Sequence, residues 1–229
     1  MNLSLAQRQI VEAPIDGAIQ VLASAGSGKT RVLTERIRYI LEATKKEGII
    51  ALTFTNKAAE EMNIRLAHCE QIQDRAWIAT THSVAQRILE KYGHTIGLPT
   101  DLHIYDRDRD RMEVFLQSLR DDGIEVDKYL DISDSKELKS REKKLQTYMD
   151  IFSKIKRELL TESDVSVLYP SNNIWKVFQD YQGALINSGG IDYDDILVYA
   201  RKILVTHDWI AKIYRAQYKH ICVDEAQDL

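Results

Sequence analysis

This 229-residue sequence has no long apolar run, only two cysteines and no excess of basic residues. No segment approaches the run of about 20 apolar residues that a membrane helix needs. The first residues lack a basic stretch followed by an apolar one, so we expect no signal peptide. The two cysteines, Cys69 and Cys222, fit neither a zinc site nor a disulfide framework. We therefore expect a cytoplasmic protein that has no membrane partner.

The charge balance gives little support to nucleic-acid binding and does not exclude it. The formal net charge is −4, whereas nucleic-acid-binding domains often carry a basic excess. A binding groove needs only a local basic surface, however, so the objection is weak. Hydrophobic residues make up 44% and charged residues 29% of the chain, which is typical of a globular protein. The length fits one large or two small domains.

Strand-like and helix-like segments alternate along the first part of the sequence. Short apolar runs predict buried strands at residues 18–23, 49–54 and 76–80. Apolar residues at helical spacing predict helices between and after them, at residues 31–46, 56–67 and 82–92. This alternation indicates a parallel sheet covered by helices. Its ligands are expected at the carboxyl ends of the strands.

The middle of the sequence has helical periodicity and no convincing pair of strands. Helices are expected within residues 111–120, 136–159 and 174–186. Gly189 and Gly190 precede a return to the first pattern, with a helix at 194–204 and a buried strand at 220–224. We therefore predict an α/β fold in three parts. These are a core at residues 1–104, an all-helical insertion at 105–188, and the rest of the core at 189–229.

A glycine-bearing loop follows the first expected strand and matches the second half of the phosphate-binding motif G-x-x-x-x-G-K-[ST]. Glycines allow backbone N–H groups to converge on phosphate oxygens, and the following helix directs its positive end at them. Lys29 would reach the β- and γ-phosphates, and the Thr30 hydroxyl would bind Mg²⁺. A chance glycine-rich turn is the alternative, and the flanking strand and helix argue against it. The expected nucleotide-binding residues here are Ala25, Gly26, Ser27, Gly28, Lys29, Thr30 and Arg31, with Lys29 also catalytic.

Two carboxylates follow the last expected strand. Asp224 is placed to hold the Mg²⁺ that Thr30 also binds, and Glu225 to act as general base on the attacking water. Acidic residues are also common in the first turn of a helix, and by itself that interpretation is equally good. The phosphate loop elsewhere in the chain favours the functional one. The expected cofactors are therefore ATP and Mg²⁺.

Six motifs in this order resemble those of the UvrD/Rep/PcrA-like superfamily 1 DNA helicases. The segment at residues 52–62, LTFTNKAAEEM, is an almost unaltered motif Ia. The others are similar to the Q motif, motif I, motif Ib, an aromatic-acidic motif and motif II, at residues 3–8, 23–30, 80–83, 191–197 and 223–228.

The resemblance implies a RecA-like P-loop NTPase core interrupted by a helical subdomain. It implies ATP-driven 3′ to 5′ movement along single-stranded DNA and action at single-strand/duplex junctions, in DNA repair or replication. Gln7 would read the adenine edge, and Gln227 would join the nucleotide site. The single strand would contact Thr53, Phe54, Thr55, Asn56, Thr81 and His82.

Some of these assignments have alternatives. Phe54 would otherwise be a core residue at a strand end, and His82 a helix cap. Thr81 stands where the family commonly has an aromatic. The basic residues of the helical segment would either meet duplex DNA or form a solvated face. They are Lys136, Lys139, Arg141, Lys143, Lys144, Lys154, Lys156 and Arg157.

Family members continue well past motif II, into a second RecA-like domain that this chain lacks. Their next strand would lie between the strand before Ala23 and the strand that ends at Asp224, so a gap in the sheet is expected. We expect an N-terminal fragment that binds ATP weakly, hydrolyses little and cannot unwind DNA. The alternatives are part of a RecB/AddA-like helicase–nuclease, a non-catalytic DNA- or partner-binding module, and an unrelated P-loop kinase. The oligomeric state is not predicted.

Overall fold

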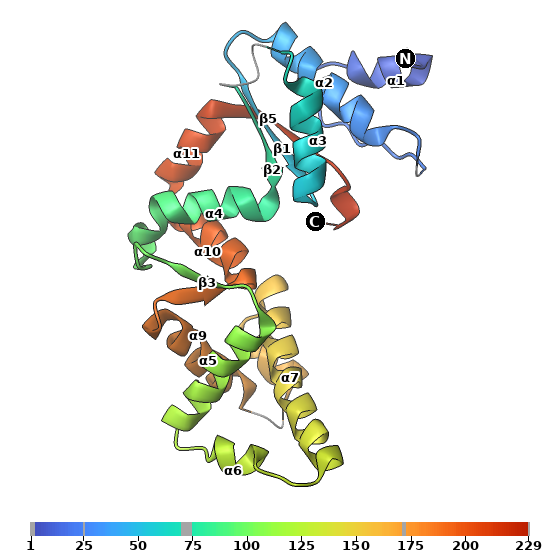
Figure 1. Cartoon of the computed structure of the whole chain (residues 1–229). Coiled ribbons are helices and arrows are strands. Elements are labelled where there is room, and N and C mark those ends of the chain that lie inside the picture. The colour runs from blue at the N-terminus through green and yellow to red at the C-terminus, as the bar shows by residue number, and fades with distance from the viewer. Residues whose placement is uncertain (1–2, 25, 70–74, 171–172, 229) are drawn as a thin grey trace. The chain divides into compact units, whose positions relative to one another are not determined.

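The computed structural model of the protein describes residues 3–24, 26–69, 75–170 and 173–228. They belong to two compact units (Figure 1). The core unit comprises residues 1–84 and 207–229, and the helical unit comprises residues 85–206. Each unit has its own cluster of buried hydrophobic residues. Within the described ranges, no helix is long and apolar enough to span a membrane.

A three-stranded parallel sheet is the centre of the core unit. Strand β1 (Gly48–Thr53) lies between β2 (Ala76–Thr80) and β5 (Tyr218–Val223). The register places Ile50 opposite both Trp77 and Ile221. Parallel strands joined through helices are the arrangement that the alternating sequence pattern indicates, and the predicted α/β fold class is confirmed.

Helices α2 (Lys29–Ala43) and α3 (Asn56–Leu66) pack on one face of this sheet. Their apolar residues recur at helical spacing, so burial of one stripe stabilises each helix against the strands. The resulting cluster consists of Ile37, Ile40, Leu41, Ile49, Ala51, Ala59, Met62, Leu66, Ile78 and Cys222. The Thr55 side chain accepts a hydrogen bond from the Ala58 N–H and so caps α3. Helix α1 (Leu5–Val11) packs against α2.

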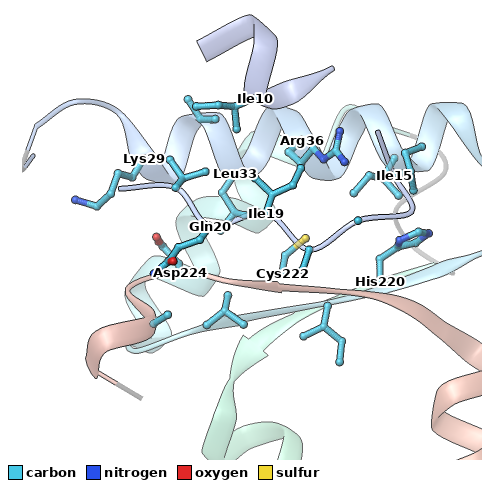
Figure 2. A pocket seen from close by; sticks show the side chains of 18 of the residues that line it. Ile10, Ile15, Ile19, Gln20, Lys29, Leu33, Arg36, His220, Cys222 and Asp224 are labelled. Carbon is cyan, nitrogen blue, oxygen red and sulfur yellow. The ribbon is translucent and has the colours of Figure 1, made fainter. Parts of the chain in front are cut away.

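The prediction of a strand at residues 18–23 is wrong. This segment is irregular, and Ile19 and Leu22 expose 46% and 85% of their surface. A strand needs a neighbour about 4.8 Å away to pair its backbone groups. Here a cavity of about 800 Å³ lies between the segment and β5 (Figure 2). The cavity occupies the place where the helicase family's next strand is expected, so the run of apolar residues has no ladder to join.

The helical unit contains most of the helices of the described chain. Helix α4 (Thr81–Tyr92) enters it from the core unit, and a short 3₁₀ helix, η1 (Gly93–Ile96), follows. The remaining helices are α5 (Asp108–Asp121), α6 (Val126–Leu130), α7 (Ser135–Arg157), α8 (Glu162–Leu168), α9 (Ile174–Asn187) and α10 (Tyr193–Thr206). Residues 136–159, expected to form one helix or two, therefore form a single long helix, α7, that ends near Arg157.

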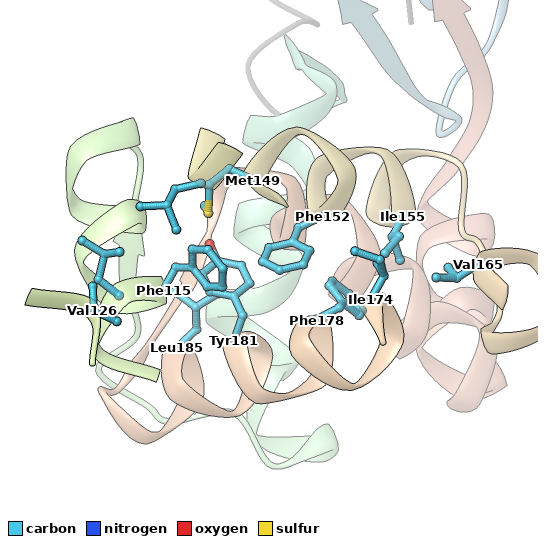
Figure 3. Packing of buried hydrophobic residues seen from close by; sticks show 12 residues of the cluster. Phe115, Val126, Met149, Phe152, Ile155, Val165, Ile174, Phe178, Tyr181 and Leu185 are labelled. Atoms are coloured by element: carbon cyan, nitrogen blue, oxygen red, sulfur yellow. The ribbon is translucent and has the colours of Figure 1, made fainter. Parts of the chain in front are cut away.

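Aromatic side chains fill the centre of the helical unit (Figure 3). Phe152 of α7 stacks on Tyr181 of α9, with 5.1 Å between ring centroids. Phe115 of α5 meets Phe152 edge to face at 5.3 Å. Such pairs add to the burial of apolar area and fix how the three helices pack.

A short parallel pair of strands lies beside these helices. Strand β3 (His103–Tyr105) pairs with β4 (Gly190–Asp192). Three residues are too few to produce a periodic signal, so the sequence did not predict this pair. The compact units also divide at other positions than the predicted domain limits, since residues 85–104 and 189–206 cluster with the helical unit. The predicted domain limits at 104 and 188 therefore stay a prediction.

Candidate nucleotide-binding site

The phosphate-loop sequence leads directly into α2. Gly26 and Gly28 have φ angles of 75° and 86°, in the left-handed region that favours glycine. Gly28 is the N-cap of α2, and helix begins at Lys29. The first N–H groups of a helix have no partner within it, so they are free to meet an anion. Ala25, also assigned to this loop, lies outside the described residues.

Lys29 and Thr30 face the acidic end of β5, although the two segments are far apart in sequence. The Thr30 hydroxyl donates a hydrogen bond to Asp224 Oδ2 at 3.1 Å, across 194 positions. Lys29 Nζ lies 3.7 Å from Glu225 Oε1 and 3.4 Å from the carbonyl oxygen of Ala23. The backbone N–H of Asp224 donates to the Leu52 carbonyl at 2.8 Å, which fixes the end of β5 against β1. The fold therefore brings the four predicted catalytic and metal-binding residues together.

Glu225 has a backbone conformation that non-glycine residues rarely adopt. Its φ angle is 49°, and such left-handed residues concentrate at functional sites. Its carboxylate also accepts a hydrogen bond from Gln227 Nε2 at 2.6 Å. Gln227 itself belongs to the 3₁₀ helix η2 (Ala226–Asp228). The turn thus presents the Glu225 carboxylate beside the phosphate loop.

The oxygen atoms of Thr30 and Asp224 fit a magnesium ion. Two oxygens 3.1 Å apart can both approach Mg²⁺ at its usual distance of about 2.1 Å. In the described part of the chain, no group of three or more His, Cys, Asp or Glu side chains could hold a metal. A site with one carboxylate and one hydroxyl suits Mg²⁺, which takes its remaining ligands from water and substrate phosphates.

The other predicted nucleotide contacts also lie near the loop. Gln7 Nε2 donates to the Ser27 carbonyl at 3.0 Å, so α1 is tied to the loop. Arg31 lies half-buried in the first turn of α2. Gln227 is exposed, two residues beyond Glu225.

The residues predicted to meet DNA lie at the ends of two neighbouring strands. Thr53 ends β1 and is followed by Phe54, Thr55 and Asn56, all exposed, with Phe54 at 61%. The exposure of Phe54 excludes the alternative that it is a core residue. Thr53 differs from the others, because it is 1% exposed and its hydroxyl donates to the Thr55 carbonyl at 3.0 Å.

Thr81 and His82 begin α4, directly after β2. Both are half-buried. The cap of this helix is supplied by Thr80, whose hydroxyl accepts from the Ser83 N–H at 3.2 Å. Because β1 and β2 are adjacent and parallel, their carboxyl ends place both groups of predicted DNA contacts along one edge of the sheet.

A buried charge cluster in the helical unit was not predicted. Lys156 is 4% exposed, and its Nζ lies 2.6 Å from Asp192 Oδ2 and 3.0 Å from Asp195 Oδ2. The expectation that Lys156 belongs to a solvated or duplex-facing basic surface is therefore wrong. The aromatic-acidic motif at residues 191–197 was the available signal, since its Asp192 and Asp195 carboxylates needed a cation once buried.

Burial and the charge of Lys156 have opposite effects on the pKa values of the two carboxyl groups in this cluster. Desolvation raises the pKa of Asp195 to about 6, although the charge of Lys156 opposes the shift. At Asp192 burial also works to raise the pKa, but Lys156 and Arg111 together hold it below its ordinary value. Tyr181 donates to Asp192 Oδ2 at 3.0 Å, and burial raises the pKa of its hydroxyl.

Comparisons with known proteins agree with this geometry. The family described as "UvrD/REP helicase N-terminal domain" matches residues 3–229. A Staphylococcus aureus protein named "ATP-dependent DNA helicase PcrA" is 32% identical over 221 residues, which cover 93% of this chain and 28% of that protein. A Staphylococcus epidermidis protein of the same name is 31% identical over an alignment of 233 positions, which covers 99% of this chain and 30% of that protein.

The chain therefore spans less than a third of the length of these curated relatives. The family match, in contrast, extends over almost the whole chain and includes both the phosphate loop and the acidic strand end. This protein belongs to the UvrD/REP helicase N-terminal domain family.

Proposed function

We propose that this chain is the ATP-binding N-terminal part of an ATP-dependent DNA helicase that moves 3′ to 5′ along single-stranded DNA. The observation that carries the proposal is the meeting of Lys29 and Thr30 with Asp224 and Glu225. A phosphate loop beside an acidic strand end is the arrangement that phosphoryl-transfer sites of this class use. The names of the relatives support the same activity.

Each residue has a distinct task in this proposal. The N–H groups at the start of α2 and the Lys29 ammonium bind the phosphates. Thr30 and Asp224 hold Mg²⁺, which would neutralise charge on the phosphates. Glu225 orients the attacking water and accepts its proton. Lys29 Nζ lies 3.7 Å from Glu225 Oε1. The ammonium would leave this contact and turn toward a phosphate when nucleotide enters.

The sheet edge formed by the ends of β1 and β2 is proposed to carry the single strand. Phe54 is exposed and would stack on a base, while Thr55 and Asn56 would hold phosphates. The buried Thr53 would support this edge through its bond to the Thr55 carbonyl. Thr81 and His82 lie on the neighbouring strand end and would extend the path.

We propose that unwinding and rapid turnover need parts of the longer parent protein. The cavity beside β5 and the short share of the relatives' length support this limit. The parent would be a repair or replication helicase that acts at single-strand/duplex junctions, or a helicase–nuclease with the same N-terminal domain. The nucleotide site described here is common to both.

The direct test is nucleotide binding to the chain itself. Titration with a fluorescent ATP analogue in Mg²⁺ should give saturable binding, which Lys29→Ala weakens at least tenfold. Lys45→Ala removes an exposed lysine just after α2 and serves as the control. Absence of binding by the wild-type chain, or equal binding by Lys29→Ala, contradicts the proposal.

A further inference from the structure

The side-chain amide of Gln7 connects α1 to the phosphate loop, because its oxygen bonds to the start of α1 and its nitrogen bonds to the loop. Its Oε1 accepts a hydrogen bond from the Ser4 N–H at 2.9 Å, and Ser4 Oγ accepts from the Gln7 N–H at 3.2 Å. This reciprocal pair is a capping box at the start of α1. With Oε1 held by the cap, Nε2 is directed away from it and donates to the Ser27 carbonyl at 3.0 Å.

The Ser27 carbonyl belongs to the peptide that carries the Gly28 N–H. A trans peptide is planar, so its C=O and N–H point in opposite directions. Holding the carbonyl on Gln7 therefore sets the direction of the Gly28 N–H, one of the donors expected to face phosphate. Gln7 also sits close to Gly28 itself, since a Cβ built there would lie 3.4 Å from Gln7 Nε2.

The other end of α1 is fixed as well. Arg36 of α2 is 8% exposed and donates to the carbonyl oxygens of Val11 at 2.7 Å and Pro14 at 2.8 Å, and also to that of Ala13. Its guanidinium lies below α1 in the core unit (Figure 2). Because these backbone bonds anchor the end of α1 to α2, the contact of Gln7 with the loop is made from a fixed support.

We propose that Gln7 is a positioning residue for the phosphate loop, in addition to any role in reading adenine. It orients the Ser27–Gly28 peptide before ligand arrives, so less free energy is lost in ordering the loop on binding. This inference rests on the proposed function of the loop as a nucleotide site. Its distinctive consequence is that loss of the Gln7 contact weakens binding of any polyphosphate, whatever base is attached.

The test compares three ligands by isothermal titration in Mg²⁺: ATP, GTP and inorganic tripolyphosphate. Gln7→Met removes the donor to Ser27 while keeping the side-chain length. One hydrogen bond contributes about 1 kcal/mol, so affinity should fall about fivefold. The inference expects at least this fall for all three ligands, with any further loss for ATP due to adenine reading. Gln7→Asn, too short to reach Ser27, should behave likewise and carries the test if Gln7→Met does not fold.

Two control variants separate the loop contact from the stability of α1. Ser4→Ala removes the capping hydroxyl and leaves the Gln7 amide in place. Gln9→Met changes an exposed glutamine on the same helix. Both should bind tripolyphosphate within twofold of wild type.

The outcomes distinguish this inference from the proposed function. A loss confined to ATP shows that Gln7 only reads the base and overturns the inference. An unchanged affinity in Gln7→Met, or an equal loss in Ser4→Ala, also overturns it while the nucleotide site stands. If the wild-type chain binds none of the three ligands, the proposed function fails and this inference fails with it.

Discussion

Lys156 should be one of the most sensitive positions for the stability of the helical unit. It is 4% exposed and lies within 3.0 Å of the carboxylates of Asp192 and Asp195, both of which are fully buried. Lys156→Met preserves much of the volume of the side chain and removes its charge. Two carboxylates would then share the remaining partners: Arg111, 3.6 Å from Asp192, and the Tyr181 and Gln182 side chains.

The size of the loss follows from two limits. Breaking a buried ion pair by removing one partner costs about 3–5 kcal/mol. The chain can escape part of that cost by protonating Asp195. With a folded-state pKa of about 6, this protonation costs about 1.4 kcal/mol at pH 7, and Asp192 still loses its charge-assisted hydrogen bond from Lys156, which is worth about 2 kcal/mol. We therefore expect Lys156→Met to lower the free energy of unfolding by about 3–4 kcal/mol.

Urea unfolding followed by far-UV circular dichroism measures this change. Lys144→Met, an exposed lysine on the same helix, is the matched control and should change the free energy of unfolding by less than about 0.5 kcal/mol. Combining Lys156→Met with Asp192→Asn and Asp195→Asn should restore part of the loss, because no buried charge is then unpaired. A loss below about 1 kcal/mol in Lys156→Met would refute the reasoning.

Two further predictions concern pH and DNA. The folded-state pKa of Asp195, raised by burial to about 6, means that its stabilising contribution is complete below its unfolded pKa and lost as pH rises through about 6. Relative to Asp195→Asn, the wild-type chain should therefore lose stability between about pH 4, near the ordinary pKa of a carboxyl, and pH 6, and equal pH dependence of the free energy of unfolding in the two proteins would contradict this. Phe54→Ala should weaken binding of a fluorescent oligo-dT by about 1–3 kcal/mol through lost base stacking, measured by anisotropy. Ile64→Ala, which trims another exposed apolar side chain of the core unit, should have no effect, and equal losses would contradict a stacking role.

The sequence was most informative where chemistry requires particular residues at a fixed spacing. The phosphate loop was predicted from glycines, a lysine and a threonine that follow an apolar run. The opposite side of the site was predicted from an acidic pair that follows another apolar run. The structure brings Thr30 and Asp224 within 3.1 Å. Their roles in binding and catalysis stay predictions, since geometry shows proximity and not turnover.

Sequence reasoning was least reliable where the outcome depends on distant partners. The apolar residues at 18–23 predict a strand, yet pairing depends on a neighbour that the periodicity of one segment does not reveal. The burial of Lys156 was not predicted either, because lysine is usually exposed. Only the pairing with two carboxylates from β4 and α10 explains this burial. The pair β3 and β4 was missed because three residues carry no measurable alternation.

The central claim is that the phosphate loop and the end of β5 form one magnesium–nucleotide site. The most direct measurement is ATP affinity with and without Mg²⁺, in the wild-type chain and in Asp224→Asn. The account predicts that Mg²⁺ strengthens binding by the wild-type chain, and that Asp224→Asn removes this gain while Mg²⁺-free binding remains. An equal gain from Mg²⁺ in both proteins would contradict the claim.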